Sequence, residues 1–336
     1  MPREIKKAVG EVGRCFKEAG LKPGDLLLLA CSGGRDSLAL ALCARICARS
    51  MGLLLAGIVV DHGMQEGSGK VAARAVKQLS KMGISAKVVK ISLDPREEKE
   101  TGEEAAAREA RHGALKREAK SEGARAVLLA HTLTDQAESV LLDACRTPSS
   151  SSWIGMEKAC LRDGVLYLRP LLQISRRETT QICREAGISW WDDPTNGSEG
   201  EAGSDLPRRS RIRSLVMPEL EAISGGGAQA HLAQFASMHR EDEEFLDSLA
   251  RKALGGASFS LPFSLPSSLF TSLPRPVERR CCRIILKNFL DRRAAVERQV
   301  EAFINLLDKG RGEIFLASSL RLCVSRGEVV INLCNN

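Results

Sequence analysis

The chain has 336 residues, which is enough for two or three domains at roughly 100 to 200 residues per domain. Its apolar fraction of 43% and charged fraction of 27% are typical of folded globular proteins and exclude collagen, a coiled coil and disorder throughout. The formal net charge of +7 permits an anionic partner without requiring one. Aromatic residues make up only 4%, which disfavours a surface that binds single strands mainly by base stacking.

The N-terminus and the cysteines indicate a cytoplasmic protein. Residues 1–20 alternate basic and acidic side chains at helical spacing and lack the apolar stretch of a signal peptide, so they predict a surface helix. No run approaches the roughly 18 apolar residues that cross a membrane, and we expect no membrane partner. The eleven cysteines contain no C-x-x-C pair, which disfavours zinc and iron–sulfur sites and favours buried, reduced thiols.

Between residues 25 and 172, short apolar runs alternate with segments of helical period. Strands are predicted at the apolar runs, over residues 26–32, 53–61, 85–92, 124–132 and 165–172. Helices are predicted between them, over residues 37–50, 69–82, 103–122 and 135–146. This alternation predicts an α/β fold with a doubly wound, mainly parallel sheet, whose ligands bind at the carboxyl ends of the strands.

The composition changes after residue 172. A helix is predicted first, then a polar stretch, then a basic segment that is helical up to Pro218, over residues 176–187, 190–209 and 211–224. Beyond a glycine-rich joint we expect a long amphipathic helix, a proline-punctuated connector, two helices and a terminal hairpin, over residues 231–254, 259–274, 276–290, 294–310 and 314–333. We therefore predict a larger domain over residues 1–223 and a smaller, mainly helical domain over residues 224–336.

The strongest chemical signal is the segment CSGGRDS, residues 31–37, between the first strand and its helix. Gly33 and Gly34 allow a tight turn with unobstructed backbone amides, and the helix N-terminus adds a positive dipole end, so the segment predicts a phosphate or pyrophosphate cradle. It lacks the lysine of a Walker loop and the third glycine of a dinucleotide fingerprint. Asp36 either caps the helix or holds a magnesium ion that bridges to phosphates. The alternative is an ordinary capped turn.

Several motifs together resemble one enzyme family. SGGRDS matches the SGG-x-DS motif of the PP-loop ATP pyrophosphatases, which split ATP into AMP and pyrophosphate while adenylating a substrate. Over roughly the first two thirds of the chain, further motifs occur in the order found in the tRNA(Ile)-lysidine synthetases of that superfamily. These motifs are VVDHG (59–63), AHTLTDQAES (130–139), RPLLQISRRE (169–178), DDPTN (192–196) and RRSRIRSLVMPEL (208–220).

This resemblance implies a two-step ligation. ATP adenylates the wobble cytidine of an isoleucine tRNA with a CAU anticodon, and free lysine then displaces AMP to form lysidine. The resemblance implies ATP as a substrate, Mg²⁺ as a cofactor, and tRNA(Ile) and free L-lysine as partners; whether the protein forms a homodimer stays open. Residues 1–223 are then expected to be the PP-loop catalytic domain, and residues 224–336 an accessory tRNA-binding domain.

The resemblance also implies roles for individual residues. Asp135 and Glu138 lie three apart on one helix face and are expected to bind or activate lysine, unless they form an ordinary acidic first turn. Arg111 is expected to neutralise phosphates of the adenylated intermediate, unless it belongs to a solvated helix face. The expected catalytic residues are Asp36, Arg111, Asp135 and Glu138. The expected ATP-binding residues are Ser32, Gly33, Gly34, Arg35, Asp36, Ser37, Asp61 and His62. The residues expected to meet tRNA phosphates, with a basic helix terminus as the alternative, are Arg208, Arg209, Arg211 and Arg213.

Some positions depart from the family's pattern. Thr134 stands where the family carries the first of two aspartates, a serine-rich segment beginning at Thr147 replaces Gly-Ser-Gly, and Ser210 replaces an asparagine. Two other functions are alternatives to the ligase. A PP-loop tRNA thiolase is disfavoured because related thiolases carry C-x-x-C pairs. A non-catalytic tRNA-binding descendant is disfavoured by the intact SGGRDS motif and by Asp135 and Glu138.

Overall fold

The computed structural model of the chain divides into two compact units. The first comprises Met1–Leu142 and Gly155–Ala233, and the second comprises Asp143–Ile154 and Gln234–Asn336. The chain therefore changes from the first unit to the second within two helices, α6 (Leu133–Arg146) and α10 (Ala228–Ala253), and returns to the first unit between Ile154 and Gly155. The division into domains over residues 1–223 and 224–336 stays a prediction. The residues that the structure describes are 1–61, 63, 67–92, 102–146, 153–192, 207–290, 293–317 and 320–333.

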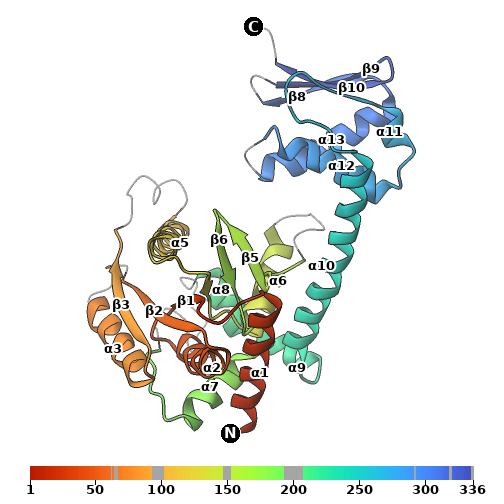
Figure 1. Cartoon of the computed structure of the whole chain (residues 1–336). Helices are drawn as coiled ribbons and strands as arrows, with labels where there is room; N and C mark the ends of the chain where they lie inside the picture. Colours follow the sequence, from red (N-terminus) through yellow and green to blue (C-terminus); the bar gives the residue numbers. More distant parts are fainter. Residues whose placement is uncertain are drawn as a thin grey trace. The chain divides into compact units, whose positions relative to one another are not determined.

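A six-stranded sheet forms the centre of the first unit. Its strands are β1 (Leu26–Ala30), β2 (Leu54–Asp61), β3 (Ser85–Lys90), β4 (Ala126–Leu128), β5 (Ala159–Arg162) and β6 (Val165–Leu168). They lie in the order β3-β2-β1-β4-β6-β5 (Figure 1). Neighbours from β3 to β6 pair in parallel, and β5 runs antiparallel to β6. This topology confirms the predicted doubly wound, mainly parallel sheet.

Helices cover both faces of this sheet: α1 (Arg3–Glu18), α2 (Arg35–Met51), α3 (Ser68–Lys81), α5 (Glu103–Ser121), α6 (Leu133–Arg146) and α7 (Arg176–Glu185) (Figure 1). Successive residues of β1 point to opposite faces. Leu27 and Leu29 belong to the core that includes α1 and α2, whereas Leu28 belongs to the core that includes α5. A strand covered on both faces needs an apolar side chain at every position, which explains the unbroken run of leucines.

The basic segment after residue 207 is helical. A short helix, α8 (Arg208–Arg211), continues into a π-helical turn, η3 (Ile212–Val216), and then into α9 (Met217–Ile223). The sequence predicts that this helix ends at Pro218, and that prediction is wrong. Pro218 lies in the first turn of α9, where its missing N–H removes no hydrogen bond of that helix.

The second unit contains a four-stranded antiparallel sheet in the order β7-β10-β9-β8. Its elements after α10 are β7 (Phe263–Pro266), α11 (Ser268–Thr271), α12 (Arg275–Lys287), α13 (Arg293–Lys309), β8 (Gly312–Ala317), β9 (Leu320–Ser325) and β10 (Glu328–Leu333). Strands β9 and β10 form the predicted hairpin, with Arg326 and Gly327 at positive φ in its turn. Strand β7 falls in the stretch predicted as a connector. It is an edge strand that ends on Pro266, where a missing N–H is tolerated.

Two other features of the described residues bear on the sequence predictions. No described helix is long and apolar enough to cross a bilayer. The described cysteines are free, and seven of them are buried.

Candidate active site

The turn between β1 and α2 is built tightly around two glycines. Gly33 has φ of +80°, which strains any larger residue, and an added Cβ would crowd the Cβ of Ala75 at 3.0 Å. Gly34 is the N-cap of α2, and its N–H donates to the Ser32 hydroxyl at 3.3 Å. The Ser37 hydroxyl donates back to the Gly34 carbonyl at 2.8 Å. The loop therefore presents a helix N-terminus without bulky side chains at the carboxyl end of β1, as an anion site requires.

Asp36 lies in the first turn of α2 but does not cap it, because the N-cap is Gly34. Its carboxylate turns instead to α7. Oδ1 accepts from the Thr179 hydroxyl at 2.5 Å, and Oδ2 pairs with Nε of Arg176 at 3.2 Å. Arg35 Nε lies 3.4 Å from Oδ1. Of the two roles predicted for Asp36, the cap is therefore wrong, and the carboxylate sits among cationic and hydroxyl partners.

The first turn of α6 carries the two other predicted carboxylates. Asp135 Oδ2 accepts from both the N–H and the hydroxyl of Thr132 at 2.8 Å, and the Asp135 N–H donates back to that hydroxyl at 3.3 Å. Asp135 thus exchanges reciprocal hydrogen bonds with Thr132 at the start of α6, in the manner of a capping box, and whether it also binds lysine stays a prediction. Glu138 has a fully buried side chain and accepts two hydrogen bonds from Arg213, from Nε at 2.6 Å and from Nη2 at 2.9 Å.

The same arginine joins the two carboxylates. Nη2 of Arg213 lies 3.7 Å from Oδ1 of Asp135, and Nε of Arg209 lies 3.8 Å from Oε2 of Glu138. Arg209 also donates to the Ser139 hydroxyl at 2.5 Å. Two members of the predicted tRNA-binding cluster therefore bind acidic and polar side chains of α6.

The pKa values of the two carboxylates of α6 are shifted in opposite directions. Burial raises the pKa of Glu138 above its usual range, and the guanidinium of Arg213 opposes this rise. Burial also acts to raise the pKa of Asp135, but Arg176 and the hydrogen bonds from Thr132 outweigh it and hold that pKa below its usual range. Two acidic groups whose pKa values are pushed apart are suited to different roles, one as a proton acceptor and one as a permanent anion.

The remaining predicted residues are distributed around this cluster. Arg208 and Arg211 are exposed, in contrast to Arg209 and Arg213, and Arg111 is exposed on α5. Asp61 is buried at the end of β2, where its Oδ1 accepts from the N–H of Gly63 at 3.1 Å. His62, residues 193–196 of the DDPTN motif and the substituted loop at 147–152 lie outside the described residues.

Arg176 and Thr179 were not among the predicted site residues. Both lie on the first turn of α7, which begins with a capping box between Ser175 and Glu178. The sequence carries that signal as S-R-R-E, the S-x-x-E pattern of a helix start. Residues three apart share a helix face, so a helix that begins at Arg176 directs that side chain and Thr179 to the same neighbour. What the sequence could not show is that this neighbour is Asp36.

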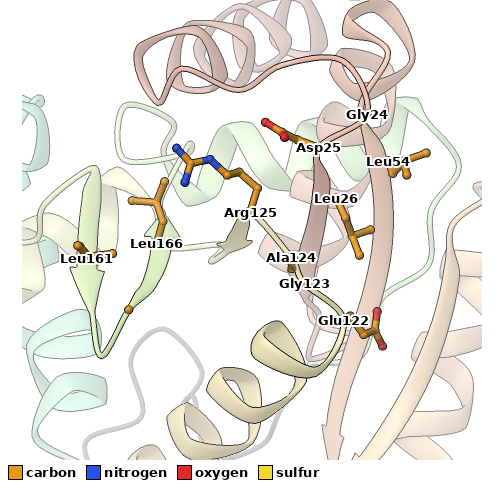
Figure 2. Close-up of a pocket in the computed structure, with 11 residues that line it drawn as sticks. Gly24, Asp25, Leu26, Leu54, Glu122, Gly123, Ala124, Arg125, Leu161 and Leu166 are labelled. Atoms are coloured by element: carbon orange, nitrogen blue, oxygen red, sulfur yellow. The ribbon is translucent and has the colours of Figure 1, made fainter.

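A hollow of about 540 Å³ lies at the opposite edge of the sheet (Figure 2). It is lined by residues at the amino ends of β1 and β2 and near β4 to β6: Gly24, Asp25, Leu26, Leu54, Glu122, Gly123, Ala124, Arg125, Leu161, Gly164 and Leu166. The PP-loop and the start of α6 follow the carboxyl ends of β1 and β4, and Asp61 is the last residue of β2. Because ligands of parallel sheets bind at the carboxyl ends, this hollow is separate from the candidate site.

Comparison with known proteins agrees with this geometry. A family described as the PP-loop domain matches residues 3–220. A tRNA(Ile)-lysidine synthase from Salinispora arenicola is 35% identical over 330 residues, which are 97% of this chain and 95% of that protein. The chain belongs to the tRNA(Ile)-lysidine synthase family. Synthases of this family from Bifidobacterium longum subsp. infantis and Streptomyces coelicolor are 42% and 38% identical over 74% and 79% of this chain, which spans 65% and 72% of their lengths.

A solved structure shares the fold of this family member. The U34-tRNA thiolase NcsA from Methanococcus maripaludis, solved with its [4Fe-4S] cluster, has a TM-score of 0.57 at 18% identity, over 70% of this chain and 79% of that chain. At this identity the likeness shows the fold alone. Among the residues that the structure describes, no group of three His, Cys, Asp or Glu side chains is placed to hold a metal ion.

The burial of His131 makes the stability of the protein depend on pH. It lies between β4 and α6, and its buried Nδ1 has no hydrogen-bond partner among the described residues. Burial lowers its pKa from 6.5 to about 4; Asp135 opposes this shift, whereas Arg169 and Arg209 add to it. Between these two pH values the unfolded chain binds a proton that the folded protein does not. The free energy of unfolding therefore falls as the pH is lowered from 6.5 towards 4.

Replacing His131 by glutamine should weaken this dependence. Between pH 7 and pH 5, we expect His131→Gln to lose about 2 kcal/mol less of its free energy of unfolding than the wild type, measured by urea denaturation. His231→Gln, at an exposed histidine, is the matched control and should keep the wild-type dependence. An unchanged dependence in His131→Gln would contradict a neutral, buried imidazole.

Proposed function

We propose that this protein ligates free lysine to the wobble cytidine of a tRNA(Ile) with a CAU anticodon, through an adenylated base, and releases AMP and pyrophosphate. The observation that carries the proposal is one charged cluster at the carboxyl edge of the sheet. Arg176 binds Asp36 beside the PP-loop, and its charge also lowers the pKa of Asp135 on α6. The ATP-binding turn and the two carboxylates proposed for lysine are therefore electrostatically coupled.

The first step is assigned to the PP-loop. The helix N-terminus at Gly34 and the amides around Gly33 stabilise the negative charge that develops on pyrophosphate as it leaves. A magnesium ion fits this chemistry, since Mg²⁺ binds through one or two carboxylates and phosphate oxygens, and Asp36 supplies such a carboxylate. When bound, the ion would neutralise phosphate charge. Asp61, at the end of the next strand, is assigned to the adenosine side.

The second step is assigned to α6. Lysine carries two ammonium groups, and only a neutral amine can attack the adenylated base. Asp135, whose pKa is lowered, is assigned as the anion that binds an ammonium group. Glu138, whose pKa is raised by burial, is the better proton acceptor and is assigned as the general base. Arg213 occupies the Glu138 oxygens in this structure, so lysine must take over part of that contact.

The tRNA is assigned to the basic segment. Arg208 and Arg211 are exposed and suited to phosphate contacts, which position RNA without reading its sequence. Arg209 and Arg213 contact side chains of α6. That they also bind tRNA phosphates stays a prediction. The target base lies in a single-stranded anticodon loop and can enter a pocket without opening a duplex.

Incorporation of labelled lysine tests the proposal. With ATP, magnesium and an unmodified isoleucine CAU transcript, we expect about one lysine per tRNA, with equal amounts of AMP and pyrophosphate. The matched control is the same transcript with the wobble cytidine changed to uridine, which should accept none. Binding of ATP and tRNA without incorporation would refute the ligase and leave a thiolase or a non-catalytic binder.

A further inference from the structure

A chain of hydrogen bonds links the start of α10 to the PP-loop, within the first compact unit. Glu221 of α9 accepts from the backbone N–H of Gln229 at 3.0 Å. Oε1 of Gln229 accepts from the Thr134 hydroxyl at 2.7 Å, and Thr134 accepts from the backbone N–H of Arg176 at 3.3 Å. The side chain of Arg176 then pairs with Asp36. Thr134, which departs from the family's pattern, therefore lies in the middle of this series of hydrogen bonds.

The Thr134 hydroxyl donates one hydrogen bond and accepts another. A hydroxyl has one proton, which goes to Gln229, and lone pairs, one of which takes the N–H of Arg176. Arg176 is the first residue of α7, so its N–H has no acceptor within its own helix. Thr134 is only 5% exposed, and water cannot readily replace it. An aspartate at this position has no proton at neutral pH to give to Oε1 of Gln229, so it could pair with Gln229 only if the amide turned round to present Nε2.

We propose that the Thr134–Gln229 pair is a positioning element for ATP use. It fixes the first turn of α7 and thereby holds the Arg176 guanidinium against Asp36. The inference deepens the proposed function and rests on it, because Asp36 acts there on the phosphates of ATP. Both residues are assigned an indirect role, through the contact of Thr134 with the backbone N–H of Arg176.

The test removes the hydroxyl at nearly constant volume. Thr134→Val should raise the KM for ATP on the order of tenfold, because a buried donor and acceptor lose their partner, while kcat changes by less than about threefold. Thr134→Ser should restore the KM to within about twofold of wild type. Gln229→Leu should give the same rise as Thr134→Val, and the double variant should add nothing further, as expected for one coupled unit.

A matched control and a binding measurement keep the result interpretable. Thr180→Val removes a hydroxyl that donates to the Arg176 carbonyl within α7, and should leave the KM for ATP unchanged. The Kd for ATP, measured by calorimetry without tRNA or lysine, should rise in Thr134→Val as the KM does. If the wild type binds ATP but incorporates no lysine, the proposed function fails, and these Kd values still test the pair. A wild-type KM and Kd in Thr134→Val, or an equal defect in Thr134→Ser, would overturn the inference.

Discussion

Asp36→Ala is expected to lower lysidine formation by roughly 1,000-fold and to leave tRNA binding within about twofold of the wild type. The Asp36 carboxylate lies beside the PP-loop, where it accepts from Thr179 and pairs with Arg176. Its loss removes the carboxylate proposed to hold magnesium and frees Arg176 from its fixed position. Arg208 and Arg211, the exposed cations of α8, are unchanged by the substitution.

The measurement pairs labelled-lysine incorporation at saturating ATP with filter binding of the tRNA. Asp36→Asn keeps the volume and one acceptor oxygen but loses the charge, and should be as inactive as the alanine variant. Asp25→Ala is the control at the opposite edge of the sheet (Figure 2). The Asp25 carboxylate accepts from the backbone N–H of Lys22. This variant should retain activity. Loss of tRNA binding and of the folded state in Asp36→Ala would show that Asp36 is structural.

The central sheet could be predicted because burial on both faces leaves a strong pattern in the sequence. β1 and β2 are short apolar runs followed by helical segments, and their order fixes a parallel sheet. β5 was missed because it has no such pattern. It is an edge strand with an exposed Leu161, and its pairing with β6 determines its conformation. β7 was missed because Pro262 before it and Pro266 at its end indicate a connector, and only the sheet partner β10 makes it a strand.

Some features of the candidate site could likewise be predicted from local sequence, and others could not. The PP-loop turn and the shared face of Asp135 and Glu138 follow from local spacing, so the sequence could show them. The partner of Glu138 could not be found in this way, because Arg213 lies 75 residues further along the chain. A run of arginines looks the same in sequence whether it faces RNA phosphates or a buried carboxylate. The structure separates the two cases, since Arg213 turns inward and Arg211 stays exposed.

Glu138→Gln is expected to destabilise the protein by about 3 kcal/mol and to lower lysidine formation by at least about 100-fold. Glu138 is fully buried and receives two hydrogen bonds from Arg213, whose side chain is itself only 16% exposed. Glutamine keeps the volume, but it leaves the guanidinium with only the more distant carboxylate of Asp135, 3.7 Å away, and removes the proposed general base. Urea denaturation and lysine incorporation measure the two effects separately.

Substituting the arginine separates stability from catalysis. Arg213→Met leaves the buried Glu138 with only the more distant Arg209, 3.8 Å away, and its pKa should rise further because the guanidinium of Arg213 no longer opposes burial. A raised carboxyl pKa favours the folded state at low pH, so the loss of about 3 kcal/mol near pH 7 should diminish as the pH falls below that pKa.

The double variant with Glu138→Gln should be more stable than either single variant, yet still inactive, because the pair is removed together. Glu109→Gln, in the exposed pair with Arg162, is the control and should change stability by less than about 0.5 kcal/mol. Strictly additive losses in the double variant would show that the Glu138–Arg213 contact is not the source of the stability.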